Sequence, residues 1–217
     1  MGRFVGTRSD NAMGCVMKLP VILLTLFTLS ACATTPPSNQ ADACAIFEEN
    51  RSWYRAAQRT ERKWDVPIAM QLAFIRKESS FDRAARPARG KFLFVLPGRR
   101  ASSAVGYAQA LDGTWDEYRK DTGKSGASRK NFADSTDFIG WYVNQSARRA
   151  GISTDDAYSQ YLAYHEGAGG YVRGTWRSKP EVQRRASVVA STTSRYEAQL
   201  SRCAHKFRRD IPLVPFI

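Results

Sequence analysis

The chain has 217 residues, of which 43% are hydrophobic, and its formal net charge is +13. This length suits one domain with a hydrophobic core, and the basic excess indicates an anionic partner such as a nucleic acid, a membrane surface or a charged polymer. The only histidines are His165 and His205, and no cysteine and histidine cluster has zinc-ligand spacing, so we expect no metal site and no cofactor. A serine hydrolase is disfavoured because no Gly-x-Ser-x-Gly motif occurs.

The N-terminal segment has the pattern of an export signal. Lys18 precedes an apolar run over residues 19–29, which is shorter than the roughly 20 residues that a membrane-spanning helix needs. The run ends in Leu-Ser-Ala-Cys, which resembles a bacterial lipobox and implies cleavage before Cys32 and lipidation of that residue. We therefore predict a lipoprotein signal peptide over residues 1–32, with Met17 as the natural start. An ordinary secretory signal that happens to contain a cysteine is the alternative.

Residues 33–42 are polar and contain two prolines, so we interpret them as a flexible linker. The remaining chain, 43–217, is predicted to be one mainly α-helical domain. Apolar residues recur at helical spacing over 43–64, which predicts an amphipathic helix, and again over 67–78, where Pro67 suits a first helical position.

Residues 83–100 form a basic block that contains six arginines and lysines and no acidic residue. The short apolar run at 92–96 inside it predicts a strand or a tucked loop, and hence a small β element near residues 90–100. We consider two roles for this insertion. It is either a basic flap over one end of a binding groove or a structural loop whose arginines are solvated.

Further helices are predicted after Asp112, Asp134 and Asp155, each of which is placed to cap a helix. A last, long helix carries apolar residues in steps of three and four from Val182 to Cys203. Cys44 and Cys203 are the cysteines that remain once Cys32 and Cys15, which lies upstream of Met17, are set aside. Outside the cytoplasm they can form a disulfide, and two buried free thiols are the alternative.

One carboxylate stands out. Glu78 closes the apolar helix over 67–78 and is followed by Ser79, Ser80 and Phe81. A carboxyl that faces an apolar wall is desolvated and holds its proton near neutral pH, as a general acid must. The alternative is a solvated glutamate at a helix end.

Three short motifs occur in order: Glu78-Ser-Ser-Phe, Gly106-Tyr-Ala-Gln109 and Ala163-Tyr-His-Glu-Gly167. Together, over residues 66–170, they resemble the soluble lytic transglycosylase (SLT) domain of the lysozyme-like superfamily. The resemblance implies cleavage of peptidoglycan by a single glutamate, here Glu78, without a cofactor. A protein of this family cuts the β-1,4 bond between N-acetylmuramic acid and N-acetylglucosamine and leaves 1,6-anhydromuramoyl ends.

The resemblance also implies roles for residues near Glu78. Gln109 and Tyr107 are expected to lie in the sugar groove, and Tyr164 is expected to orient Glu78 through its hydroxyl. Ser79 or Ser80 is expected to bond the glutamate or the substrate, unless the serine only caps the helix. The family has asparagine where this chain has His165, which either alters the contacts with the substrate or is only a core or rim residue.

Glu166 follows His165 and supplies a possible second carboxylate. Lysozyme-type hydrolysis is therefore an alternative activity, and a noncatalytic peptidoglycan-binding envelope lipoprotein is another. An exported, lipid-anchored chain rarely meets nucleic acid, so we assign the basic charge to envelope polyanions and expect no nucleic-acid partner. The residue after Cys32 is alanine rather than aspartate, which implies sorting to the outer membrane, facing the periplasm.

Overall fold

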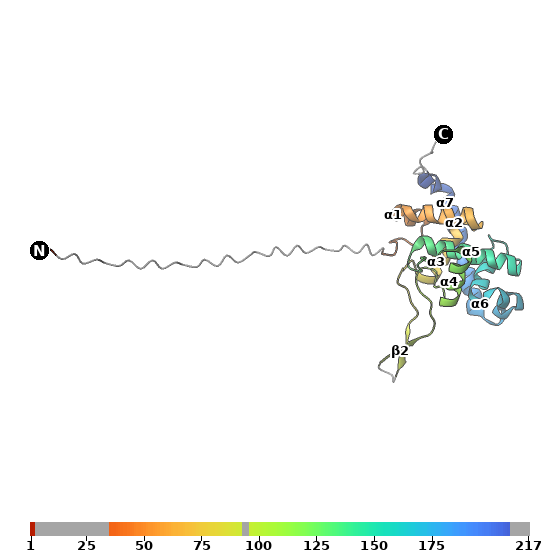
Figure 1. Ribbon diagram of the computed structural model, residues 1–217. Coiled ribbons are helices and arrows are strands. Elements are labelled where there is room, and N and C mark those ends of the chain that lie inside the picture. The colour runs from red at the N-terminus through yellow and green to blue at the C-terminus, as the bar shows by residue number, and fades with distance from the viewer. Residues whose placement is uncertain (3–34, 93–95, 209–217) are drawn as a thin grey trace. The chain divides into compact units, whose positions relative to one another are not determined.

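The computed structural model describes residues 1–2, 35–92 and 96–208, and the predicted signal peptide and Cys32 lie outside them. The chain divides into two units, Met1–Ala33 and Thr34–Ile217. The second unit is mainly α-helical, as predicted (Figure 1). Its elements are α1 Ala43–Glu49, α2 Arg51–Trp64, α3 Ile68–Ser79, β1 Arg89–Phe92, β2 Leu96–Arg100, α4 Asp112–Thr122, α5 Phe132–Ala150, α6 Ala157–Arg173, the 3-10 helix η1 Thr175–Ser178 and α7 Pro180–Arg208. None of the described helices is both long and apolar enough to cross a membrane.

Two helix predictions need correction. The predicted helix over 43–64 is broken at Asn50, whose φ of −135° is not helical, so α1 and α2 are separate. Helix α4 begins with Asp112 itself, its N-cap is Leu111 and no side chain caps it, and helices α5 and α6 are capped by Asn131 and Asp156 rather than by Asp134 and Asp155. In α5 and α6 the capping residue is a nearby Asn or Asp whose side chain accepts an N–H group of the first turn. Which of these residues caps the helix depends on the backbone angles there.

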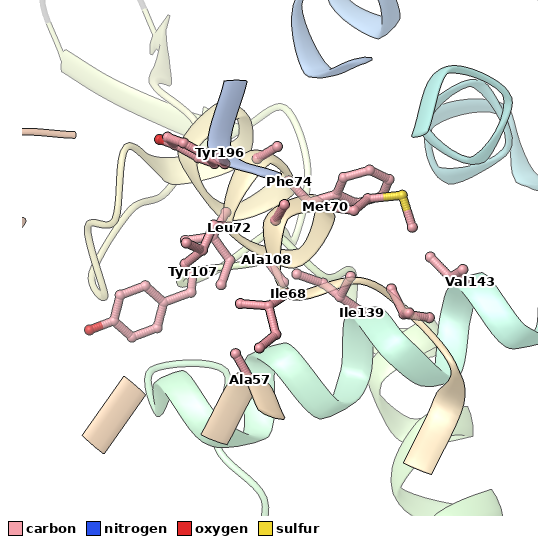
Figure 2. Close-up of a cluster of buried hydrophobic side chains, with 14 of the residues drawn as sticks. Ala57, Ile68, Met70, Leu72, Phe74, Tyr107, Ala108, Ile139, Val143 and Tyr196 are labelled. Atoms are coloured by element: carbon pink, nitrogen blue, oxygen red, sulfur yellow. The ribbon is translucent and has the colours of Figure 1, made fainter. Parts of the chain in front are cut away.

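Helix α3 lies at the centre of the fold. Every residue from Ile68 to Ile75 is buried, so the helix is covered on all sides rather than on one stripe. Figure 2 shows side chains of α2, α5 and α7 and of the segment 106–109 around it, among them Ala57, Ile139 and Tyr196. Glu78 belongs to this buried helix, so its position is set by the core and not by a loop.

Helix α7 is the longest element, and the seven residues of its predicted seam from Val182 to Cys203 are all buried. A disulfide joins Cys44 of α1 to Cys203 of α7 across 159 residues of sequence. Gln199 strengthens this connection, because its side chain accepts from the Ala43 N–H at 2.8 Å and donates to the Ala41 carbonyl at 3.1 Å. The start of the domain is thereby attached to its last helix.

The strands β1 and β2 form an antiparallel hairpin between α3 and α4, with Phe92 opposite Leu96 and Arg89 opposite Arg100. This is the small β element that the apolar run at 92–96 predicted. The proposed role of the insertion as a flap stays a prediction.

Candidate active site

Glu78 lies in the last turn of α3 and contacts α6. Its Oε1 accepts a hydrogen bond of 2.8 Å from the hydroxyl of Tyr161. Phe74, one turn earlier on α3, meets the ring of Tyr161 edge-on at 5.4 Å and the ring of Tyr164 at 5.3 Å. The carboxyl group therefore lies beside an aromatic wall and has one specific polar partner in it.

Burial of the Glu78 carboxyl raises its pKa above the ordinary value of 4.5. The hydrogen bond from Tyr161 and the positive charges of His165, Arg185 and Lys77 oppose this effect without cancelling it. Glu78 lies in the last turn of α3, at the negative end of the helix dipole, which also disfavours the ionised carboxylate. Glu78 thus keeps its proton at pH values at which an exposed glutamate has lost it.

The chain turns sharply after Glu78. Ser80 and Phe81 both have positive φ, 50° and 61°, a conformation that non-glycine residues rarely adopt. Phe81 is completely buried and stacks on Trp53 at 5.8 Å between ring centres. Its burial offsets the cost of the turn and ends the helix directly after the carboxylate.

The second motif forms a tight loop beside α3. Gly106 has a φ of 76°, and a Cβ there would lie 2.0 Å from the backbone oxygen of Arg129, so only glycine fits. The Arg129 side chain donates to the Ala110 carbonyl at 3.0 Å, and the Tyr164 hydroxyl donates to the Ala108 carbonyl at 2.5 Å. The loop is therefore fixed from two sides.

Gln109 ends this loop in an αL conformation, with a φ of 48°. Its Nε2 donates to the carbonyls of Ala85 and Gly106 at 3.0 and 2.8 Å. Two carbonyl acceptors fix the orientation of the amide, so Oε1 points away from them as an acceptor. Such an oxygen suits the N–H of an acetamido group.

Gln109 lines a pocket of about 270 Å³ between the loop, α4, α5 and α6. Other residues that line it are Phe138, Tyr142, Tyr164, His165 and Glu166. Glu78 is not among the described residues that line this pocket, but Tyr164, which lines it, packs its ring against Phe74, one turn before Glu78 on α3. At Gly167 the helix α6 kinks, with φ 74° and ψ 154°, a combination that glycine alone adopts readily. His165 and Glu166, which line the pocket, directly precede this kink.

Glu166 does not resemble Glu78. Its side chain is only 5% exposed, and its oxygens accept from the Thr175 hydroxyl at 2.5 Å and from Lys179 Nζ at 2.9 and 3.0 Å. Its carboxylate also contacts His165 Nδ1 at 3.1 Å. These bonds lower its pKa to about 2. Glu166 is therefore ionised at neutral pH and joins α6 to η1 and the start of α7.

Asp137 of α5 is a second buried anion, 8% exposed. Burial alone raises the pKa of Asp137, but bonds from Lys124, Trp64, Tyr118 and Lys63 outweigh burial and lower it. The cluster joins α2, α4 and α5. Of the three carboxyl groups Glu78, Asp137 and Glu166, the pKa is raised at Glu78 and lowered at the other two.

The structure assigns the partner of Glu78 differently from the sequence prediction. Tyr161, one helical turn before Tyr164, makes the bond that we expected from Tyr164, whose hydroxyl instead holds the Ala108 carbonyl. Both tyrosines lie on the face of α6 toward Phe74, and their spacing of three residues was visible in the sequence. The depth of each ring, which decides which hydroxyl reaches the carboxylate, was not.

Three further residues differ from expectation. Tyr107 is 2% exposed and packs edge-on against Trp53 and Phe132, so it supports the loop from the core and does not line the pocket of Gln109. The Ser79 hydroxyl donates to the Ile75 carbonyl at 3.1 Å, and Ser80 is the αL residue that ends α3. No described hydrogen bond joins either serine to Glu78, and a bond from one of them to the substrate stays a prediction.

Among the described residues, no cluster of three or more His, Cys, Asp or Glu side chains is placed to hold a metal ion. The comparison with curated proteins found no match. The family described as transglycosylase SLT domain matches residues 20–203, most of the chain, including Glu78, Gln109 and Tyr164. Such a match supports a transglycosylase-type enzyme that acts on peptidoglycan. The helical fold, the buried carboxyl and this match agree, and the chain belongs to the transglycosylase SLT family of the lysozyme-like superfamily.

Proposed function

We propose that this protein is a lytic transglycosylase that cleaves the β-1,4 bond between N-acetylmuramic acid and N-acetylglucosamine. The observation that carries the proposal is the raised pKa of Glu78 beside a pocket with a fixed amide oxygen, while the other buried carboxylates are tied up as anions. A protonated carboxyl is what departure of a sugar hydroxyl requires.

In the first step Glu78 donates its proton to the glycosidic oxygen, the bond to C1 of the muramic acid breaks, and positive charge develops at C1. The ionised Glu78 is then stabilised by the Tyr161 hydroxyl and by the nearby positive charges of Arg185 and Lys77. It next removes the proton from the C6 hydroxyl of the same sugar, whose oxygen closes on C1. The product is a 1,6-anhydro ring, no water is consumed, and Glu78 is protonated again.

The geometry supports the internal nucleophile over hydrolysis. A retaining hydrolase uses a second carboxylate about 5 Å from the first, and an inverting enzyme uses one with a free oxygen to activate water. Glu166 has both oxygens bonded to Thr175 and Lys179, so it is poorly suited to either task. An intramolecular hydroxyl needs no such partner, because it is already held next to C1.

Digestion of purified peptidoglycan sacculi distinguishes the candidate activities. A transglycosylase releases fragments with anhydro ends, each lighter by one water than the product of a hydrolase. A noncatalytic binding protein sediments with the sacculi and releases nothing. Fragments that carry the full mass of a hydrolysed end would contradict the proposal.

The variant Tyr161→Phe tests how Glu78 is tuned. In the wild type the hydrogen bond from Tyr161 favours the ionised form of Glu78. Loss of this bond in the variant therefore raises the pKa of Glu78 further. The alkaline limb of the pH profile of kcat/KM, along which Glu78 loses its proton, moves to higher pH. We also expect kcat to fall about tenfold or more, because the carboxylate that forms during proton donation has lost a charged hydrogen bond.

Tyr158→Phe is the matched control for this experiment. It removes a hydroxyl from the same helix, one turn earlier, where no hydrogen bond to Glu78 is made. The control is expected to retain the wild-type pH profile. If the alkaline limb of Tyr161→Phe coincides with that of the wild type, Tyr161 does not tune the carboxyl.

We further propose that the protein is anchored to the bacterial outer membrane through a lipid on Cys32 and faces the periplasm. The proposal rests on the short apolar run over 19–29 and the Leu-Ser-Ala-Cys sequence that follows it. The variant Cys32→Ala is expected to move the protein from the membrane fraction to the soluble fraction, because the signal run alone is too short to span a bilayer. Fractionation and immunoblotting measure the shift. Unchanged membrane attachment would contradict lipidation at Cys32.

A further inference from the structure

A second hollow lies between α3 and α7 and is about 420 Å³ in volume; we call it the α3/α7 groove. It is lined by Arg76, Lys77 and Ser80 of α3 and its cap and by Val188, Ser191 and Arg195 of α7, among others. None of the described residues that line it is acidic. Within the described part of the chain, no carboxylate forms an ion pair with Arg76, Lys77 or Arg195.

The groove ends next to Glu78. The start of α3 shares a pocket with Leu200 and Ala204, whereas its end, at Lys77 and Ser80, faces Val188 and Ser191, so the two helices run antiparallel. Lys77 and Ser80, which line the groove, flank Glu78 in the sequence. The end of the groove therefore lies next to the turn of α3 that carries the carboxylate.

Three cations around one hollow favour an anionic ligand. The Arg195 guanidinium makes a long hydrogen bond of 3.4 Å to the Thr192 hydroxyl and lies over the ring of Tyr196 at 5.8 Å. Arg76 contacts the Tyr196 hydroxyl at 3.5 Å. Because a guanidinium has five N–H donors, both arginines keep donors for a carboxylate.

The groove also has an apolar contact. The side chain of Val188 is 51% exposed, and it is one of the few large apolar residues of the described chain that face solvent to this extent. The pocket beside Gln109, in contrast, has no arginine or lysine among its described lining residues and presents the rings of Phe138, Tyr142 and Tyr164, which suit neutral N-acetyl sugars. The two hollows thus differ in the chemistry they can bind.

We propose that the α3/α7 groove binds the peptide stem of peptidoglycan through the carboxylates of that stem. The inference deepens the proposed function and rests on it. The stem branches from the muramic acid whose bond is cut, so it must leave the sugar groove close to Glu78. It combines free carboxylates with small apolar side chains, which match Arg76, Lys77 and Arg195 and the exposed Val188. Val188 and Arg195 lie seven positions apart in α7, which corresponds to about 10 Å of helix and to the length of about three extended peptide residues.

The test uses chemically defined glycan tetrasaccharides that carry stem peptides in two forms, with free carboxylates or with the same carboxylates amidated. Wild-type protein is expected to cleave the free form with a kcat/KM about three- to tenfold higher than that of the amidated form, as one or two exposed charge contacts give. In Arg195→Gln this ratio is expected to fall toward one, through a higher KM for the free form. Arg195→Lys keeps the charge and should retain most of the preference.

Arg202→Gln is the matched control, since it removes the same charge from the same exposed face of α7 outside the groove. Its ratio should equal that of the wild type. A second variant, Ser191→Asp, places a negative charge inside the groove and should lower the ratio below that of Arg195→Gln. Thermal melting shows that the variants are folded.

The outcomes separate the two proposals. If the wild type cleaves both substrates to anhydro products with equal kcat/KM, or if Arg195→Gln and Ser191→Asp keep the wild-type preference, the groove does not read stem carboxylates, while the transglycosylase assignment stands. If the wild-type protein forms anhydro products from neither substrate and also digests no sacculi, the proposed function itself is wrong.

Discussion

Replacing Glu78 by glutamine is expected to abolish the release of anhydro fragments from sacculi, with a loss of about 10²- to 10⁴-fold in rate. Glutamine preserves the size of the side chain, and its amide oxygen can still accept the Tyr161 hydroxyl. It cannot donate an acidic proton to the glycosidic oxygen or recover one from the C6 hydroxyl. Mass spectrometry of the soluble fragments measures both the rate and the identity of the ends.

The loss is expected without a loss of stability. In the wild type the folded state holds the Glu78 proton more tightly than the unfolded state, so ionisation of this group destabilises the fold as pH rises from about 4.5 through the raised pKa. Glu78→Gln removes that penalty, and its free energy of unfolding near neutral pH should equal or exceed that of the wild type. Below pH 4.5 the difference should vanish.

Glu181→Gln is the control for this experiment. It makes the same chemical change at an exposed position in the first turn of α7, so activity should stay at the wild-type level. Wild-type rates in Glu78→Gln would contradict the assignment of the acid. An unfolded Glu78→Gln protein would contradict the expectation about stability, and activity would then be read from the pH profile of the wild type.

Removing the Cys44–Cys203 disulfide has the largest expected effect on stability. The bridge closes a loop across 159 residues, and in the chain-entropy model a loop of this length stabilises the fold by about 5 kcal/mol. The double variant Cys44→Ser, Cys203→Ser is therefore expected to unfold at a much lower urea concentration. Its m-value should rise, because an unfolded chain without the crosslink exposes more surface.

Reductant provides the control for the disulfide prediction. It should shift the urea midpoint of the wild type toward that of the double variant and leave the double variant unchanged. The hydrogen bonds of Gln199 to Ala41 and Ala43 remain in both, so the native contact between α1 and α7 is kept. Equal midpoints for the wild type and the double variant would show that the bridge does not stabilise the domain.

Much of the fold follows from local pattern. The helix over 67–78 was predicted to within one residue of α3 Ile68–Ser79, because apolar spacing and Pro67 are properties of the chain itself. The seam of α7 from Val182 to Cys203 was predicted for the same reason. The break at Asn50 was missed, since two helices that bury the same face carry one continuous periodicity.

The site residues divide in a similar way. The sequence singled out Glu78, Gln109 and His165, and the structure brings them to one region around α3 and α6. The sequence could not show whether Tyr161 or Tyr164 is the partner of the Glu78 carboxyl. Both tyrosines lie on one face of α6, and only their positions in the folded protein decide which hydroxyl reaches the carboxyl. Nor could the sequence assign Tyr107 to the core, where Trp53 and Phe132 enclose it.

The sequence by itself therefore determined the helical class, the family and the one carboxylate at the end of an apolar helix, because these depend on residue type, order and spacing. Only the tertiary structure decided in which direction the pKa of each carboxyl group is shifted. Burial of the carboxyl raises the pKa of Glu78, whereas the bonds from Thr175 and Lys179 lower the pKa of Glu166 to about 2. A pKa depends on neighbours that the chain brings together from distant positions, and only folding determines which neighbours those are.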